Sequence, residues 1–263
     1  MGTLFVVATP IGNLGDISER ALRTLRDVDL IACEDTRHTI KLLNHFQIQK
    51  PLESYHDFNE EKKAQQLAGR IAAGLNVALV SDAGTPAISD PGYRLVRACR
   101  EQGIEVVAIP GASAAIAALS VSGLPSDEFL FVGFLPAKSG ARRQRLEALQ
   151  PLPSTLIFYE APHRVEGTLE DLLRVLGDRE ACVAREITKL HEEYLFGRLA
   201  ALKEKVKAVG EFVIVVKGCE KDAEKTSPAL QGLSRNEVLR LLADKTGIPK
   251  NALYDALLKP DAE

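Results

Sequence analysis

Residues 77–109 read VALVSDAGTPAISDPGYRLVRACREQGIEVVAI and contain two strand patterns on either side of one helix pattern. The strands are predicted at Val77 to Val80 and at Val106 to Ile109, where apolar and β-branched residues run together. Between them, apolar residues from Leu95 to Cys99 recur at helical spacing before Gly103 ends the helix. Nearly continuous apolar strands that alternate with amphipathic helices predict a parallel sheet covered by helices on both faces.

The same alternation runs through the rest of the first half. Strands are predicted at Leu4 to Ala8 and at Leu30 to Cys33. A second amphipathic helix is predicted from an N-cap at Asn59 to a terminating Gly74. We therefore predict an N-terminal α/β domain over residues 1–120.

The second half repeats these patterns after a linker predicted at Gly123 to Asp127. One helix pattern runs from Val165 to Leu176, and we predict a C-terminal α/β domain over residues 121–218. Its strands are predicted at Phe129 to Val132, Thr155 to Tyr159, Cys182 to Ala184 and Phe212 to Val216.

Residues 219–263 differ in composition from the domains before them. Glu220 to Ser227 is charged and lacks an apolar period, as flexible linkers do. Ser234, with Glu237 three residues later, predicts a capping box for a short helix, and a second helix is predicted to begin near Pro249. The pair resembles a helix-turn-helix, a form that also serves as a plain packing unit.

Composition is that of an ordinary globular protein, with 46% hydrophobic and 26% charged residues. No apolar run approaches the roughly 18–20 residues that span a bilayer. Met1 to Phe5 leads directly into a strand pattern, so we expect no signal peptide.

The scattered cysteines form no C-x-x-C pair and are expected to be buried apolar side chains. This use of cysteine is typical of a reducing compartment and favours the cytoplasm. The net charge of −3 restricts any nucleic-acid contact to a local surface.

Loops that follow the strands are the candidate binding sites, because ligands of open parallel sheets bind beyond the carboxyl ends of the strands. Thr9 to Gly15 lacks the G-x-G-x-x-G spacing and by itself favours a tight turn. Ser81 to Gly92 is rich in small residues and lacks the Lys of a P-loop, which argues against ATP or GTP hydrolysis. Within it we predict ligand contacts for Asp82 to Ala87 and an N-cap role for Asp90.

Ionisable residues gather after two predicted strands of the second half, at Tyr159 to Arg164 and at Arg185 to Glu192. His and Cys spacing predicts no metal site, and no Ser lies in a G-x-S-x-G motif, so metal-dependent hydrolysis and acyl transfer are disfavoured. The densest basic segment fits a solvated helix face and a phosphate-binding surface equally well. Its cations are Lys138, Arg142, Arg143 and Arg145.

Four motifs stand in the order and spacing of one known family. They are LFVVATPIGN at Leu4 to Asn13, SDAGTPAISDPG at Ser81 to Gly92, PGASA at Pro110 to Ala114, and YEAPHR at Tyr159 to Arg164. Over about residues 3–217 the chain resembles the small-subunit ribosomal RNA cytidine 2′-O-methyltransferases, which have the tetrapyrrole-methylase fold and use S-adenosylmethionine. The corrin and haem-pathway C-methylases usually carry G-D-P where this chain reads Ser81 to Gly84, a departure that favours the RNA branch.

The resemblance implies two α/β domains of the tetrapyrrole-methylase type with a helical extension, a homodimer, and S-adenosylmethionine in the cleft between the domains. By motif, the cofactor contacts carried over to the first domain are Pro10, Asp82, Ala83, Gly84, Thr85, Pro86, Ala87, Ser113 and Ala114. Those carried over to the second domain are Phe134, Ala161 and the stretch from Gly210 to Phe212, which includes Glu211.

Methyl transfer to a ribose hydroxyl needs in-line alignment and is helped by a base. Glu160, Glu186 and Lys189 are the candidate bases by chemical type and strand-end position, although a structural role explains each of them equally well. Lys189 would need a lowered pKa to act as a base. Phosphate contacts or carboxylate pairs that shape the cleft are predicted for Arg37, Arg164 and Arg185.

Two other functions stay open from the sequence. One is C-methylation of a tetrapyrrole on the same fold, which the net charge of −3 fits equally well. The other is a non-enzymatic RNA-binding or assembly factor that keeps a vestigial pocket. Binding of S-adenosylmethionine would separate both enzymes from the assembly factor.

Overall fold

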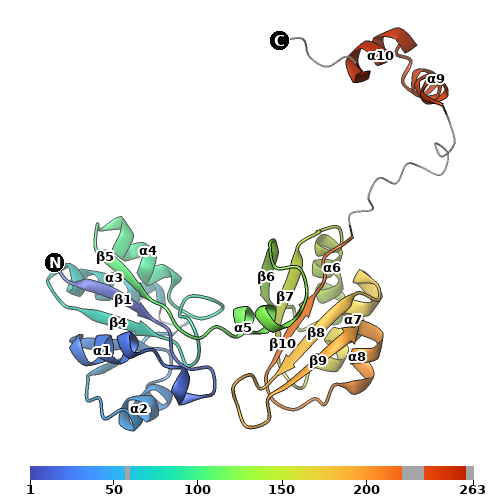
Figure 1. Cartoon of the computed structure of the whole chain (residues 1–263). Coiled ribbons are helices and arrows are strands. Elements are labelled where there is room, and N and C mark those ends of the chain that lie inside the picture. The colour runs from blue at the N-terminus through green and yellow to red at the C-terminus, as the bar shows by residue number, and fades with distance from the viewer. Residues whose placement is uncertain (57–59, 221–233, 259–263) are drawn as a thin grey trace. The chain divides into compact units, whose positions relative to one another are not determined.

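The computed structural model describes residues 1–56, 60–220 and 234–258. The chain divides into two compact units, Met1–Cys219 and Glu220–Glu263. The first unit contains two five-stranded sheets, and the described part of the second contains a pair of helices (Figure 1). None of the described helices is long and apolar enough to cross a membrane.

The first sheet is wholly parallel, as predicted, with strand order β3-β2-β4-β1-β5. Its strands are β1 (Thr3–Val7), β2 (Leu30–Cys33), β3 (Leu52–Ser54), β4 (Val77–Val80) and β5 (Glu105–Ile109). Its helices are η1 (Leu14–Asp16), α1 (Glu19–Asp27), α2 (Thr36–His45), α3 (Glu60–Ala72) and α4 (Tyr93–Glu101). The N-cap predicted at Asn59 lies outside the described residues.

Alternate residues of each inner strand face opposite layers of helices. On β4, Ala78 and Val80 pack with the buried side of α1 and α2, whereas Val77 and Leu79 pack with α3 and α4. Both faces of the strand are therefore covered, which explains why the sequence reads as an unbroken apolar run.

The second sheet is mixed, with strand order β6-β7-β10-β8-β9. Only β6 and β7 pair in parallel, and the other neighbours are antiparallel. Its strands are β6 (Phe129–Phe134), β7 (Thr155–Glu160), β8 (Glu180–Arg185), β9 (Glu193–Arg198) and β10 (Phe212–Val216). One face packs against α6 (Ser139–Leu149), α7 (Val165–Leu176) and α8 (Leu199–Lys205).

The helix α5 (Ala114–Val121) covers the opposite face of this second sheet. Ala115, Ala118 and Leu119 pack there against strand residues of β7, β8 and β10. These helix residues precede the domain boundary that we predict at residue 120, although they pack with the second sheet. The division at residues 120 and 218 stays a prediction.

The described part of the second unit consists of α9 (Arg235–Thr246) and α10 (Lys250–Leu258). The capping box predicted at Ser234 and Glu237 is confirmed. Gly247 follows α9 with a φ of 70°, a left-handed conformation that ends the helix. Most of the predicted charged linker, Glu220 to Ser227, lies outside the described residues.

We expect Ser234→Ala to destabilise α9 by about 1 kcal/mol, because the substitution leaves the Glu237 N–H without its cap. The check is amide hydrogen exchange along α9 in the full-length protein. Ser234→Thr is the matched control, since it keeps an oxygen that can accept the bond. Equal exchange in the wild type and the Ala variant would contradict this role of the cap.

Candidate functional site

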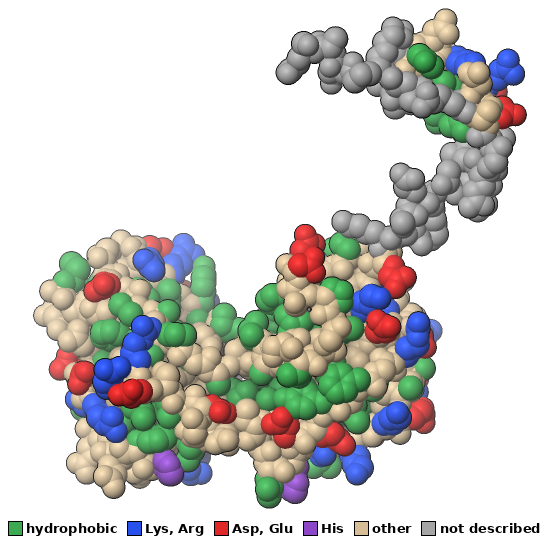
Figure 2. All heavy atoms as spheres, in the orientation of Figure 1, with side chains coloured by type: hydrophobic (Ala, Val, Ile, Leu, Met, Phe, Trp, Pro, Cys, Tyr) green, Lys and Arg blue, Asp and Glu red, His purple; other side chains and the backbone are tan. Residues whose placement is uncertain are grey.

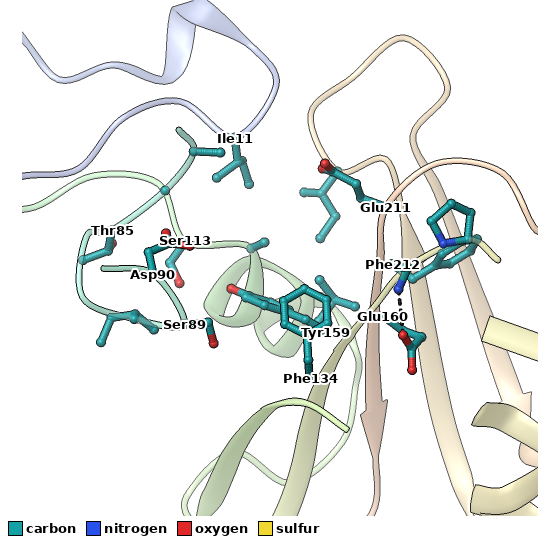
Figure 3. A pocket seen from close by; sticks show the side chains of 18 residues that line it. Ile11, Thr85, Ser89, Asp90, Ser113, Phe134, Tyr159, Glu160, Glu211 and Phe212 are labelled. Atoms are coloured by element: carbon teal, nitrogen blue, oxygen red, sulfur yellow. Dashed lines mark hydrogen bonds between the residues drawn. The ribbon is translucent and has the colours of Figure 1, made fainter. Parts of the chain in front are cut away.

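Loops at the carboxyl ends of first-sheet strands face strand ends of the second sheet across a cavity of about 410 Å³ (Figure 3). This volume is in the range of small-molecule sites. The first-sheet loops and the start of α5 contribute Ile11, Ala83, Gly84, Thr85, Ile88, Ser89, Asp90, Ser113 and Ala114. The second sheet and its loops contribute Phe134, Tyr159, Glu160, Ala161, Pro162, Ile187, Glu211, Phe212 and Val213.

The loop after β4 is fixed in place by its backbone. Gly84 pairs with Thr9 through two hydrogen bonds, with N···O distances of 2.9 and 3.1 Å. The Thr85 hydroxyl donates to the carbonyl of Ala112 at 3.3 Å. Ala87 and Ser89 have φ values of 66° and 63°, which non-glycine residues adopt only where the surroundings impose them. The loop therefore presents a preformed backbone surface to the cavity.

Tyr159 links the floor of the cavity to the first turn of α5. Its hydroxyl accepts a hydrogen bond from the Ala115 N–H at 3.2 Å. Burial raises the pKa of Tyr159, so the phenol stays protonated at neutral pH. Phe131 and Phe134 make edge-on contacts with its ring, at centroid distances of 4.9 and 5.7 Å.

Glu160, the residue after Tyr159, has a fully buried side chain whose carboxylate is bonded to neighbouring groups. It accepts hydrogen bonds from the Thr168 hydroxyl at 2.6 Å and from the Ala161 N–H at 2.8 Å. It also pairs with Arg164 at 3.2 Å, and Arg164 in turn donates to the carbonyl of Leu135. These contacts give Glu160 and Arg164 a structural role at the start of α7.

Lys189 lies between two carboxylates at the edge of the cavity. Its Nζ is 2.9 Å from Glu186 Oε1 and 2.9 Å from Glu211 Oε2. Burial lowers the pKa of Lys189, but the hydrogen bonds to Glu211 and Glu186 outweigh it, and the net shift is upward. This shift is opposite to the lowering that a lysine base needs, and the contacts give Lys189 a carboxylate-bridging role.

Glu186 is also a poor base. Burial raises the pKa of its carboxyl, but hydrogen bonds from Lys189 and from the Glu211 N–H outweigh burial and lower the pKa overall. A carboxylate with a lowered pKa holds a proton weakly.

Arg185, the residue before Glu186, pairs with Glu193 at 3.0 Å. Of the two roles predicted for Arg185, the structure therefore gives it the carboxylate pair and not the phosphate contact.

The basic segment needs a correction. Arg142 is buried between α6 and α7, where its Nε lies 2.6 Å from Asp171 Oδ2, and it therefore cannot contact RNA. Lys138 and Arg145 are exposed and Arg143 is half-buried, so these three remain candidates. One arginine of this segment, Arg142, therefore belongs to the core.

Residues 3–203 match the family described as Tetrapyrrole (Corrin/Porphyrin) Methylases. A protein from Synechocystis sp. named Ribosomal RNA small subunit methyltransferase I is 49% identical, with 100% of each chain covered. One of the same name from Xylella fastidiosa is 52% identical over 96% of this chain and 98% of the relative. This chain belongs to the ribosomal RNA small subunit methyltransferase I family.

Solved structures with low sequence identity share the fold of this family member. A diphthine synthase superposes with a TM-score of 0.63 at 18% identity, covering 82% of this chain and 90% of that chain. A uroporphyrin-III C-methyltransferase from Thermus thermophilus, complexed with S-adenyl homocysteine, gives 0.55 at 21% identity over 81% and 97% of the two chains. The predicted fold class is thus confirmed.

The structure brings together most of the cofactor contacts that we predict for this member of the methyltransferase I family. Nine of them line the cavity: Ala83, Gly84, Thr85, Ser113, Ala114, Phe134, Ala161, Glu211 and Phe212. Pro10, Asp82, Pro86, Ala87 and Gly210 lie outside its wall. Asp82 instead accepts a hydrogen bond from the Asp35 N–H at 3.2 Å, which ties the loop to the start of α2.

The predicted ligand contacts left out several cavity residues of this family member. Asp90 is the clearest case, because we predict an N-cap there, whereas the N-cap of α4 is Gly92 and Asp90 lines the cavity. Ile11, Ile88 and Ile187 were missed because apolar loop residues carry no chemical signal in a sequence. Tyr159 could have been found, since it begins the motif YEAPHR.

Proposed function

We propose that this chain transfers a methyl group from S-adenosylmethionine to the 2′-hydroxyl of a cytidine in small-subunit ribosomal RNA. Membership of the methyltransferase I family supports the RNA substrate class. The resemblance of the four loop motifs supports the cytidine 2′-hydroxyl as the acceptor.

The charge of the cavity wall is the observation that carries the cofactor assignment. Among the described residues that line it, Asp90, Glu160 and Glu211 carry carboxylates, and none is Lys or Arg. Glu160 and Glu211 are paired with Arg164 and Lys189 just outside the wall, so the lining itself offers no cation to the phosphates of a nucleotide, whereas acidic side chains suit the sulfonium and ammonium groups of S-adenosylmethionine. The remaining wall is largely apolar with a few hydroxyls and backbone groups, which suits an adenosine-sized ligand.

The chemistry asks this chain mainly for positioning. When bound, S-adenosylmethionine supplies a methyl group that its sulfonium already activates. The fixed loop from Ala83 to Thr85 and the first turn of α5 contact the ligand, and Phe134 and Tyr159 line the second-sheet part of the same cavity, where Tyr159 is bonded to α5. Holding donor and acceptor in line lowers the barrier to such a transfer, because the entropy of bringing the two groups together is lost on binding. Glu160, Glu186 and Lys189 all hydrogen-bond to other protein groups. This fits a reaction in which the chain aligns the donor and acceptor.

RNA is proposed to reach the site across α2. Arg37, His38, Lys41 and His45 are all exposed along this helix, and residues 36–50 contain no Asp or Glu, although Arg37 pairs with the N-cap residue Asp35 at 2.6 Å. Asp82 holds the start of α2 directly beside the cavity loop. Over the visible face in Figure 2, Lys and Arg mix with Asp and Glu, as expected for a local contact surface.

We expect the double variant Arg37→Glu and Lys41→Glu to weaken binding to small ribosomal subunits about tenfold and to lower the salt slope by about 2. Two cations that contact phosphates would be replaced by charges that repel them. Binding is measured as a salt titration with purified subunits. Lys205→Glu on α8 is the control, because it makes the same kind of change on an exposed helix elsewhere. Equal losses in both proteins would contradict a binding face on α2.

We also propose a homodimer, as the resemblance implies, and a location in the cytoplasm, which the scattered cysteines favour. Light scattering with size-exclusion chromatography tests the dimer, and a monomer at all concentrations would overturn it.

The direct test of function is methyl transfer from labelled S-adenosylmethionine to small ribosomal subunits from cells that lack this protein. Label at one ribose after nuclease mapping is expected. Label on a base, or only on a tetrapyrrole, would overturn the proposed acceptor.

A further inference from the structure

Lys189 joins three parts of the chain at one edge of the cavity. Besides its contacts with Glu186 and Glu211, its backbone N–H donates to the Glu186 carbonyl at 3.0 Å. Glu186 Oε1 also accepts the Glu211 N–H at 2.9 Å, and the Glu186 N–H donates to the Glu211 carbonyl at 2.9 Å. Glu186 and Glu211 are thus joined by hydrogen bonds of their backbones, by the Glu186 carboxylate and by the ammonium group of Lys189. We call Lys189, Glu186 and Glu211 the Lys189 bridge.

The bridge also touches the loop that follows β1. A Cβ at Gly12 would lie 2.4 Å from Lys189 Cγ, 3.0 Å from Thr188 Oγ1 and 3.2 Å from the Ile187 carbonyl oxygen. Gly12 therefore allows the second-sheet loop to pack directly against the first-sheet loop. Ile11 and Ile187, the neighbours of this contact, both line the cavity.

A second glycine makes room for the bridge from the other side. A Cβ at Gly210 would lie 2.4 Å from Glu186 Cγ, and the φ of Gly210 is 87°. Glu186 and Thr188 have φ values of 50° and 66°, both in the left-handed region that non-glycine residues rarely adopt. Strain of this kind persists only where surrounding contacts impose it, and the bridge supplies those contacts.

Within the bridge, Glu211 is the member that reaches the cavity. Its side chain is 79% exposed, yet its carboxylate is held by Lys189. Figure 3 shows the Glu211 carboxylate on the side of the cavity that Ile11 faces. An exposed glutamate samples several rotamers unless a partner fixes its side chain. If Lys189 holds one rotamer before the ligand arrives, the ligand does not have to order this side chain on binding.

We propose that Lys189 is a positioning residue that holds the Glu211 carboxylate in the cavity wall and, over Gly12, joins the two loops that close this edge of the cofactor site. The proposal rests on the proposed function, because it takes the ligand of the cavity to be S-adenosylmethionine. The held carboxylate faces a ligand that carries two cationic groups. Lys189 itself need not touch the ligand or exchange a proton.

The test is a double-mutant cycle on the full-length protein, with S-adenosylhomocysteine and S-adenosylmethionine as calorimetric probes. We expect Lys189→Met, which keeps the alkyl stem over Gly12, to weaken S-adenosylmethionine binding about fivefold to tenfold. Lys189→Arg is expected to restore most of the affinity. In a Glu211→Gln background, Lys189→Met is expected to cost less than twofold, because the carboxylate that it positions is gone.

Thermal midpoints without ligand separate positioning from general destabilisation. A Lys189→Met variant that keeps its melting temperature but loses affinity supports the proposal. Loss of the same size with and without the Glu211 carboxylate would overturn it, and so would unchanged affinity in Lys189→Met. A wild type that binds neither probe would overturn the proposed function instead, and a wild type that binds both without methylating ribosomal subunits would overturn only the acceptor.

A separate variant tests the loop contact. Gly12→Ala places a methyl group against the stem of Lys189, and we expect it to weaken S-adenosylmethionine binding at least fivefold. Gly15→Ala, in the same loop with its nearest neighbour at 3.2 Å in Asn13, is the matched control and is expected to bind within twofold. Equal affinity in Gly12→Ala and the wild type would overturn the role of the contact.

Discussion

Arg142→Ala is expected to destabilise the protein by about 3–5 kcal/mol, because it leaves a buried carboxylate without its counter-charge. Arg142 and Asp171 have side chains that are only 7% and 6% exposed, and their closest atoms are 2.6 Å apart. The guanidinium also donates to the Gly167 carbonyl at 3.2 Å, so it joins α6 to α7 in more than one place. The Ser139 hydroxyl remains with Asp171 at 2.9 Å and offsets only part of the loss.

Urea unfolding of the full-length protein measures this effect, followed by the fluorescence of tyrosine and by circular dichroism. The adjacent Arg143→Ala is the matched control, since Arg143 is half-buried at the surface of the same helix, and it should cost less than about 1 kcal/mol. Replacing both partners, as in Arg142→Met with Asp171→Leu, is expected to recover most of the stability, because no unpaired charge is left. A loss below about 1 kcal/mol in Arg142→Ala would contradict the pairing.

The same contact explains why the sequence misled on this residue. Arg142 stands among cations at the surface, and its partner Asp171 comes 29 residues later on another helix. The partner of Lys189 was hidden for a similar reason, since Glu211, which raises the pKa of Lys189, follows 22 residues later, just before another strand. A side chain's type and local spacing cannot reveal a partner that only the tertiary fold supplies.

The first sheet was predictable because its inner strands are buried on both faces. β2 and β4 are buried along their whole length, so each appears in the sequence as an apolar run. The edge strand β3 has three half-buried residues and gave no such signal. The direction of strands in the second sheet was also beyond the pattern, because helices cover both faces of that sheet and β7, β8 and β10 therefore appear as the same apolar runs that parallel strands give.

The motif loops located the cavity better than they located single side chains. Ala83, Gly84 and Thr85 act through a preformed backbone, which small residues in a strand-end loop do indicate. Apolar wall residues such as Ile88 and Ile187 depend on how the two sheets face each other. The sequence therefore predicted where the ligand binds, and the structure was needed to find what encloses it.

Ala114→Phe is expected to lower the affinity for S-adenosylmethionine at least about 100-fold, equivalent to about 2.7 kcal/mol. Ala114 is the first residue of α5 and lines the cavity beside Ser113. A phenyl ring there enters a space of about 410 Å³ that the proposed ligand must largely fill. The side chain is only half-buried, so the ring can be accommodated in the empty cavity and folding should be little affected.

Calorimetry with S-adenosylmethionine, together with the thermal midpoint without ligand, separates a blocked site from a damaged fold. Ser120→Phe introduces the same ring on the same helix at an exposed position that does not line the cavity, and it should bind the ligand like the wild type. If Ala114→Phe melts like the wild type and still binds normally, the cofactor does not occupy the space beside α5. The argument from the acidic side chains of the wall would then fail as well, because Asp90 and Glu211 belong to the same cavity.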